Sequence, residues 1–203
     1  MPEKTVQKEP GKKPAPSKKP KPQQEVVVQI PLSELHPFPD HPFQVREDAS
    51  MQETAESVKE YGVLVPALAR PREDGGYELI AGHRRKHACE LAGLATMPVI
   101  VRDIDRDAAT IIMVDSNLQR ENILPSERAK AYKMKMEAIK RQGARTDLTS
   151  PKISAKFRSD DEVGQDAGVS GDTIRNYIAL TQLVPELQQM VDEKKIALSP
   201  AYQ

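Results

Sequence analysis

The sequence predicts an α+β N-terminal domain, with a small mixed sheet and helices, followed by an all-α helix-turn-helix domain. Between residues 26 and 102, short β-branched or apolar runs alternate with segments of helical periodicity. From Asp105 onward the apolar residues follow only the helical period. We therefore divide the chain into a tail at residues 1–24, an α+β domain at 25–124 and a helical domain at 125–203, with the helix-turn-helix at about 160–181.

The strands of the α+β domain are expected at residues 26–30, 63–70, 77–81 and 98–102. Prolines should make residues 36–42 irregular. Pro66 should confine its strand to an edge or a bulge of the sheet. The turn Asp74-Gly75-Gly76 should join the second and third strands as a hairpin.

Helix boundaries follow from capping residues. Ser50 and Glu53 form a capping box that should start a helix ending at Gly62. A further helix is expected at residues 105–119, and Pro125 suits the first turn of the next one. That last helix begins a basic run, because residues 128–145 hold seven basic side chains and one acid. Residues 143–159 then read as a long polar connection.

The third strand, Gly82 and a helix from His83 onward form the most informative stretch. Such a turn leaves the first backbone N–H groups of the helix without partners. Arg84, Arg85 and Lys86 lie in this first turn, where the helix dipole favours acids instead. An anion such as phosphate would satisfy the dipole, the N–H groups and the cations together. The other interpretation is a solvated basic turn.

A second pattern of interest covers residues 160–181. A first helix should end at Gly168, Ser170 should cap a second one, and Ile174 and Ile178 should lock that helix inward. Arg and Asn are well shaped to contact guanine and adenine edges in a major groove. Plain helical hairpins share this pattern, and Gly164 stands where alanine is usual. We predict a DNA-reading helix because a basic helix and an anion site precede it in the chain. The predicted DNA-binding residues are Ser170, Asp172, Thr173, Arg175 and Asn176.

Composition excludes several classes. The single cysteine, Cys89, cannot form an internal disulfide, which suits a reducing cytoplasm. No apolar run approaches the roughly 20 residues that a membrane span needs. The net charge of zero hides an asymmetry, because residues 1–24 hold seven lysines against two glutamates, which leaves 23 basic and 28 acidic residues elsewhere. This Lys/Pro-rich tail should be disordered. It is either a solubilising tail or a basic tether for a partner protein or DNA.

Four stretches in order make the chain similar to ParB-type DNA partition proteins from about residue 26 to 203. They are His-Pro-Phe-Gln-Val-Arg at 41–46, Tyr-Gly-Val-Leu-Val-Pro at 61–66, Gly-His-Arg-Arg-Lys-His-Ala at 82–88 and Asn-Leu-Gln-Arg-Glu-Asn at 117–122. Any one of these motifs alone is weak evidence for the resemblance. Four motifs in the family's order, followed by a helix-turn-helix, are specific evidence.

The resemblance implies a homodimeric clamp on double-stranded DNA that is loaded at a centromere-like site and closed by CTP. It implies a nucleoid-associated, cytoplasmic protein that meets a ParA-type ATPase through its tail. It also implies Mg²⁺ near Asn117, with Ser116 and Asp115 as further ligand candidates, and Gln44 near the attacking water. The nucleotide-binding residues would be Gly62, Val63, Pro66, Gly82, His83, Arg84, Arg85, Lys86, Asn117, Gln119 and Arg120.

Two departures from the family pattern bear on hydrolysis. His83 replaces the glutamate that the family ties to hydrolysis, and Ser116 replaces an acid before the motif asparagine, although Asp115 could substitute. A slow, switch-type CTP hydrolase with Gln44 and His83 as catalytic candidates therefore stays open. The family's C-terminal dimerisation segment is also missing, so either the chain is a fragment or the N-terminal domains dimerise.

Three other interpretations compete. The main alternative is a DNA-binding transcriptional or replication regulator of the same family with a vestigial nucleotide pocket. A sulfiredoxin-like oxidoreductase would need a cysteine at the position of His83, and Cys89 lies one and a half turns further on. His83 and His87 have the spacing of metal ligands on a helix, but no third ligand is identifiable.

Overall fold

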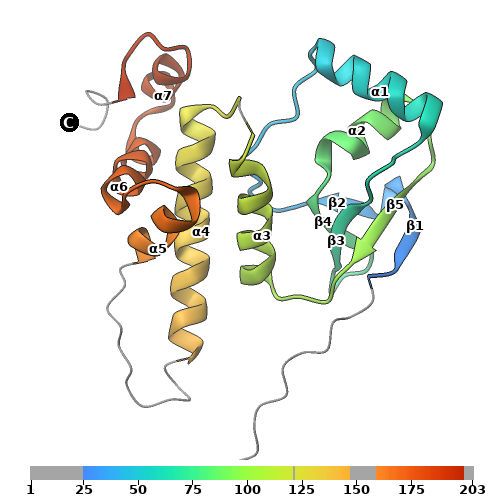
Figure 1. Cartoon of the computed structure of the whole chain (residues 1–203), viewed down its shortest axis with the longest axis horizontal. Helices are drawn as coiled ribbons and strands as arrows, with labels where there is room; N and C mark the ends of the chain where they lie inside the picture. The colour runs from blue at the N-terminus through green and yellow to red at the C-terminus, as the bar shows by residue number, and fades with distance from the viewer. Residues whose placement is uncertain (1–24, 121, 147–158, 199–203) are drawn as a thin grey trace, which may run out of the picture.

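The computed structural model describes residues 25–120, 122–146 and 159–198, and Figure 1 shows how its elements follow one another. The disorder predicted for residues 1–24 lies outside these ranges, as does most of the connection predicted at 143–159. Helix α4 (Pro125–Thr146) continues further than expected, so the first four residues of that connection are helical. Within the described ranges, no helix is both long and apolar enough to cross a membrane.

A five-stranded mixed sheet lies at the centre of the N-terminal part, in the order β1-β5-β3-β4-β2. Strands β1 and β5 pair antiparallel, as do β3 and β4, whereas β3 with β5 and β2 with β4 are parallel. This confirms the predicted small mixed sheet and the hairpin at residues 74–76. The strands are β1 (Val27–Pro31), β2 (Leu35–Pro37), β3 (Ala67–Pro71), β4 (Tyr77–Ala81) and β5 (Thr96–Val101).

One local prediction is confirmed in part and two are wrong. The strand β3 begins one residue after Pro66 and is not an edge strand, because it lies between β5 and β4, but its pairing with β4 has the register shift of a bulge, between Leu68 and Ala69. The segment at 36–42 is not wholly irregular, because Pro37 ends β2, an edge strand that tolerates a missing N–H group. The cap of α1 (Ala49–Tyr61) is Asp48 and not Ser50, since the Asp48 carboxylate accepts a 2.9 Å hydrogen bond from the Met51 amide.

Helices cover both faces of the sheet, because neighbouring strand residues point to opposite sides. Leu79 packs in a buried cluster with Met51 of α1 and Cys89 of α2 (His83–Leu91). Ile80, the next residue of β4, packs instead with Met113 of α3 (Arg106–Leu118). The core is therefore two apolar layers, with α1 and α2 on one side of the sheet and α3 on the other (Figure 1).

The C-terminal part is helical and is built on α4. The helix contributes Ala131 to the cluster under the sheet and Tyr132 to a second cluster with Val163 and Ile174. Gly164 is required here, since a Cβ atom on it would lie 2.6 Å from the Val169 carbonyl oxygen. The remaining elements are α5 (Ser159–Ala167), α6 (Gly171–Ala179), α7 (Pro185–Asp192) and two 3-10 turns, η1 (Leu32–Glu34) and η2 (Leu180–Gln182).

One residue of the predicted basic run is buried. Only 1% of the Lys135 side chain is exposed, and its ammonium donates hydrogen bonds to Asp115 of α3 at 2.6 Å and Asp166 of α5 at 2.8 Å. Burial opposes the charge, but the hydrogen bonds from the two carboxylates raise the pKa of Lys135 above its usual value. Lys135 is therefore a charged link between three helices and not part of a solvated face.

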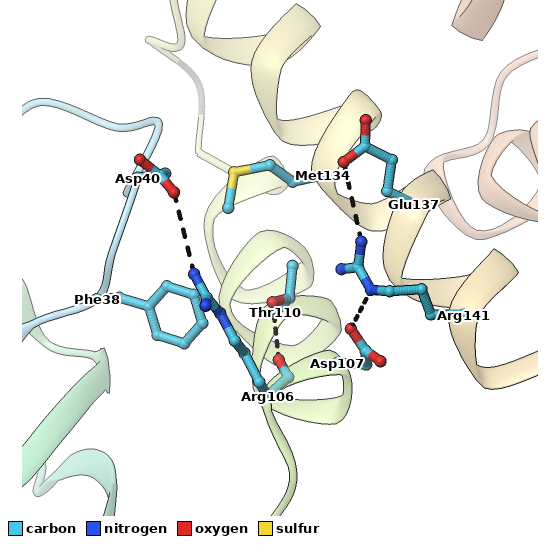
Figure 2. A pocket seen from close by; sticks show the side chains of 8 residues that line it. All are labelled: Phe38, Asp40, Arg106, Asp107, Thr110, Met134, Glu137 and Arg141. Atoms are coloured by element: carbon cyan, nitrogen blue, oxygen red, sulfur yellow. Dashed lines mark hydrogen bonds and ion pairs between the residues drawn. The ribbon is translucent and has the colours of Figure 1, made fainter. Parts of the chain in front are cut away.

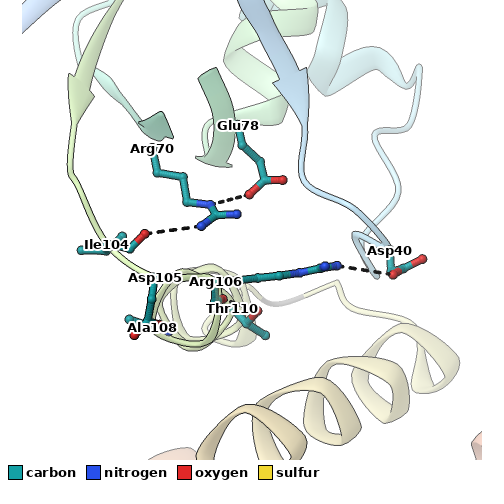
Figure 3. A network of polar contacts seen from close by, with 8 residues as sticks. All are labelled: Asp40, Arg70, Glu78, Ile104, Asp105, Arg106, Ala108 and Thr110. Carbon is teal, nitrogen blue, oxygen red and sulfur yellow. Dashed lines mark hydrogen bonds and ion pairs between the residues drawn. The ribbon is translucent and has the colours of Figure 1, made fainter. Parts of the chain in front are cut away.

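Ion pairs also hold the start of α3 against the C-terminal half of α4. Figure 2 shows Arg141 of α4 between Asp107 and Glu137 beside a cavity of about 410 Å³. The Arg141 Nε donates to Asp107, a buried residue of α3, at 2.8 Å. Figure 3 shows Arg70 of β3 bound to Glu78 of β4 at 2.5 Å and to the Ile104 carbonyl at 3.4 Å. The start of α3 is thus tied both to the sheet and to α4.

Candidate functional site

The strand-glycine-helix turn has the predicted form. Gly82 adopts the left-handed conformation with φ 113° and ψ 18°, and α2 begins at His83 with no side chain capping it. A Cβ atom at Gly82 would lie 2.8 Å from the Cβ of Ala67 in β3. Both the backbone angle and the close strand therefore require glycine at this position. The first amides of α2 are left uncapped at the rim of a cavity.

The three cations of the first turn point in different directions. Arg84 reaches the start of α1, where its guanidinium donates to the Ser50 hydroxyl at 3.1 Å. Arg85 donates to the carbonyl oxygens of Val65 and Pro66 at 2.5 and 2.7 Å. Burial lowers the pKa of Arg85 from its usual value. Lys86 pairs with Glu90 one turn along α2 at 2.5 Å. Of these three cations, only Arg84 and Arg85 line the cavity.

This cavity, of about 220 Å³, gathers most of the predicted nucleotide-binding residues. It lies between the first turn of α2, the segment after β2 and the end of α3. The predicted residues that line it are Gln44, Gly82, His83, Arg84, Arg85, Ser116, Asn117 and Arg120. Sequence reasoning did not assign His41, Phe43, Val45 and Ala81, which also line it. Three of these belong to the motif at 41–46, so the signal was present.

A larger cavity of about 450 Å³ adjoins the first one and shares Phe43, Gln44, Arg84 and Arg120 with it. Its other lining residues come from the start of α1 and the segment before α4. Sequence reasoning assigned none of them to the site: Arg46, Asp48, Ser50, Thr54, Asn122, Ile123 and Glu127. The Glu127 carboxylate accepts the backbone amides of Gln44 and Leu124 at 3.0 and 3.1 Å, so it holds this wall together.

Several predicted site residues do not line the 220 Å³ cavity. Asp115 is turned toward Lys135, and together with Gln119 it lines a separate cavity against α4 and α5. Asp115 therefore does not substitute for the acid that Ser116 replaces. The segment with Gly62 and Val63 lies outside the lining as well, although Arg85 ties its end to α2 through the Pro66 carbonyl.

Magnesium does not fit these residues as a site of their own. Among the described residues, no carboxylate lines the 220 Å³ cavity, whose described side-chain oxygens are neutral. The Asn117 carbonyl oxygen already accepts from Arg120 at 3.4 Å, and the Ser116 hydroxyl donates to the Met113 carbonyl at 3.0 Å. Protein Mg²⁺ sites usually use one or two carboxylates. Among the described residues, no group of three or more His, Cys, Asp or Glu could hold a metal ion.

The rival chemistries have little support in the geometry. Cys89 is fully buried, and burial raises the pKa of its thiol, which disfavours the thiolate that an oxidoreductase needs. His83 and His87 do not converge on a metal. The ring of His83 lies on that of His41, with 3.9 Å between centroids, whereas His87 lies 3.3 Å from Glu47 and 3.4 Å from Glu90.

His83 is neutral in the free protein. Burial is the main cause that lowers its pKa from 6.5 to about 3, and the charges of His41 and Lys86 add to the effect. Burial also lowers the pKa of His41. The Nε2 atoms of both rings are buried and have no hydrogen-bond partner in the described part of the chain.

Acid should therefore weaken the fold through His83. Between pH 6.5 and about 3, His83 binds a proton in the unfolded chain but not in the folded protein. The free energy of unfolding is therefore highest above pH 6.5 with respect to His83, and it falls as the pH drops below that value. We expect a loss of about 2 kcal/mol of unfolding free energy between about pH 7 and pH 5. Urea denaturation at the two pH values measures it. In His83→Gln the loss of unfolding free energy between the two pH values should be smaller by about 2 kcal/mol. An equal loss in both proteins would refute the lowered pKa of His83.

The candidate DNA surface lies on α6. Ser170 caps this helix as predicted, because its hydroxyl accepts a 3.2 Å hydrogen bond from the Thr173 amide. Ile174 is fully buried, and Asp172 and Arg175 are exposed. The guanidinium of Arg175 forms ion pairs with Asp160 of α5 and with Asp172. Asp160 is buried but Asp172 is exposed, so exchanging the pair with Asp172 for a base or phosphate contact costs little.

A mixed sheet with an uncapped, arginine-flanked glycine turn defines an α+β domain suited to binding an anion at a helix start. A family model for the ParB N-terminal domain matches residues 16–118, slightly more than half of the chain. The chain belongs to this family.

Curated relatives agree with this family. The chromosome-partitioning protein Spo0J of Thermus thermophilus is 35% identical over 86% of this chain and 58% of its own length. The nucleoid occlusion protein of Halalkalibacterium halodurans is 30% identical over 86% of this chain and 55% of its own. The chain thus spans somewhat more than half the length of these relatives.

Solved structures show the same fold. The C-terminally truncated ParB of Caulobacter crescentus, complexed to the centromeric parS site, has a TM-score of 0.56 and 27% identity, over 86% of this chain and 82% of that one. A Pnob8-like ParB-N domain has a TM-score of 0.58 with 18% identity, over 87% of this chain and 78% of that one, and supports the fold alone.

Proposed function

We propose that this protein is a sequence-specific DNA-binding partition protein that binds CTP and acts as a nucleotide-gated DNA clamp. The observation that carries the proposal is the 220 Å³ cavity, in which an uncapped helix start meets Arg84, Arg85 and Arg120 beside Gly82. Backbone amides and guanidinium groups that line one cavity suit a triphosphate. The ParB structure complexed to parS supports a centromere-like DNA site for this chain too.

Within this proposal, each part of the site has a distinct role. The first amides of α2 and the side chains of Arg84 and Arg120 bind the phosphates. Arg85 positions the segment that ends at Pro66, which would shape the base pocket, through its bonds to two carbonyl oxygens. Asn117 orients Arg120 at 3.4 Å. Because Arg120 follows α3 and α3 packs on α4, occupancy of the cavity can reach the helical part.

Hydrolysis is expected to be slow. The described lining of the cavity holds no carboxylate, and His83, which stands where the family has a glutamate, is neutral and stacked on His41. Gln44 and His83, which both line the cavity, are the residues that we assign to positioning water. We accordingly propose a switch that depends on binding and release, with slow turnover of CTP to CDP.

Replacing Arg84 tests the nucleotide site. Arg84→Ala should weaken CTP binding roughly 10- to 100-fold, the usual value of a charge-assisted contact. Lys86→Ala is the matched control, because this lysine lies in the same turn but points to Glu90 and should change affinity by no more than a few-fold. Isothermal titration with CTP, ATP, GTP and UTP measures both affinity and base preference. Equal losses in the two variants would contradict the assignment.

Replacing Arg175 tests the DNA surface. Arg175→Ala should relax base preference at one position of the site and cost roughly 1–3 kcal/mol of specific binding. Arg72→Ala serves as the control, because Arg72 is likewise an arginine paired with an aspartate, Asp74, but lies in the β3–β4 hairpin. Binding to a panel of single-base variants of the site gives the comparison. Unchanged specificity in Arg175→Ala would remove α6 from the DNA interface.

Partners and location complete the proposal. We expect a homodimer on the nucleoid in the cytoplasm, with the lysine-rich tail of residues 1–24 contacting a ParA-type ATPase. Charge supports the tail contact, because residues 1–24 carry seven lysines and two glutamates. Deleting the tail should abolish stimulation of the ATPase while leaving CTP binding intact.

The alternative is a DNA-binding regulator of the same family whose nucleotide pocket is vestigial. The neutral His83 and a described cavity lining that holds no carboxylate favour it. The nucleoid occlusion relative shows that similar chains bear other names. Titrating CTP with and without cognate DNA separates the two, because only the clamp shows coupled binding.

A further inference from the structure

Two half-buried imidazoles at the 220 Å³ cavity each have a buried ring nitrogen that lacks a hydrogen-bond partner among the described residues. His41 and His83 both line the 220 Å³ cavity, and their ring centroids are 3.9 Å apart. The Nε2 atoms of both rings are buried without a partner among the described residues. An unsatisfied buried polar atom costs roughly 1–3 kcal/mol, so such a pair in a native fold needs an explanation.

The hydrogen bond of His41 fixes its tautomer. Its Nδ1 lies 2.8 Å from the carbonyl oxygen of Phe43. A carbonyl oxygen can only accept, so Nδ1 carries the hydrogen and the Nε2 of the neutral ring is a bare acceptor. A phosphate oxygen is also an acceptor. The neutral ring therefore has nothing to offer a phosphate, whereas the imidazolium form has a second N–H group to donate.

We propose that His41 is a phosphate-binding residue that acts in its protonated form: when an oligophosphate fills the cavity, the stacked His41–His83 pair takes up one proton and His41 donates its Nε2–H to a phosphate oxygen. This inference rests on the proposed nucleotide function and deepens it. Because Nε2 is buried in the free protein, the two rings must part to make the contact. One proton is the maximum, because two stacked imidazolium ions would repel each other.

The surrounding charges explain why the proton arrives with the ligand. In the free protein, burial lowers the pKa of both rings, and positive neighbours act in the same direction on each. Glu127 opposes this at His41, as does the hydrogen bond to Phe43. A bound oligophosphate would reverse the sign of the local field. The charged groups that face the pair or line its cavity are Arg84, Arg85, Lys86, Arg120 and Glu127.

Calorimetry can count this proton. Titrations at about pH 7.5 in buffers of different ionisation enthalpy give the number of protons taken up on binding, with CTP and inorganic tripolyphosphate as probes. The terminal phosphate of each probe also titrates, so the informative quantity is the difference between the parent protein and His41→Asn, whose amide can still donate to the Phe43 carbonyl. His87→Gln is the control, because His87 lies on α2 outside the cavity lining.

We expect the parent and His87→Gln to take up a fraction of a proton approaching one, and His41→Asn to take up none beyond that of the probe. The parent's affinity should rise by up to tenfold for each unit of falling pH between about 8 and 7. Uptake with both probes supports the inference, and uptake with tripolyphosphate alone supports it while refuting the CTP function. Binding with equal proton counts in parent and His41→Asn overturns the inference but not the CTP site. No binding of either probe overturns both.

Discussion

Gly82→Ala is expected to lower the free energy of unfolding by about 3–5 kcal/mol and to abolish nucleotide binding. Two costs add up. The φ of 113° is unfavourable for any residue with a Cβ atom, and the new methyl group would lie 2.8 Å from the Cβ of Ala67. Relief requires β3 and α2 to separate, which would displace the first turn of α2 that lines the cavity. Urea denaturation measures the first effect and CTP titration the second.

The other end of α2 supplies the control for this variant. Gly93 has a φ of 71°, but a Cβ atom there would have no heavy atom within 4 Å. Gly93→Ala should therefore lose only the backbone term of about 1 kcal/mol and keep its nucleotide affinity. Similar losses in the two variants would show that the close approach of Ala67 does not matter.

Lys135→Ala is expected to lower the unfolding free energy by about 2–4 kcal/mol. The substitution removes a side chain of which only 1% is exposed, and it leaves Asp115 and Asp166 without their shared cation. Lys135→Met retains most of the buried stem and should lose only about 1 kcal/mol. Lys133→Ala, an exposed neighbour on the same helix, should change stability by less than about 0.5 kcal/mol.

Lys135 also links the nucleotide site to the helical part. Asp115 lies on α3, two residues before Asn117, and Asp166 lies on α5 of the helix pair. Lys135→Met should therefore reduce the effect of CTP on DNA binding more than it reduces either affinity alone. The measurement is DNA affinity with and without CTP, and full coupling in the variant would show that the link is only structural.

Elements with a strong local signal could be predicted from sequence. The strand at residues 77–81 was placed with correct bounds, and so were Gly82 and the helix start at His83. Apolar alternation, glycine and a switch of period are all local features. The central position of β3 could not be predicted from Pro66, because proline constrains only its own residue and its neighbour, and β3 begins after it.

Side-chain direction was harder to predict. Residues four apart share a helix face. That spacing could have grouped Asp115 with Gln119, and Ser116 with Arg120, as the two cavities do. The burial of Lys135 had no local signal, because its partners are 20 and 31 residues away in the sequence. The stacking of His41 on His83 likewise depends on a contact between distant segments.

The shared packing of α4 bears on how the molecule can be divided. A chain cut between residues 124 and 125 would separate Ala131 from Ile80 and Met113. Each half would then expose apolar side chains that are buried in the intact protein. Neither half is then expected to be well behaved alone, so an isolated half is a poor substitute for the intact molecule in crystallisation or drug screening.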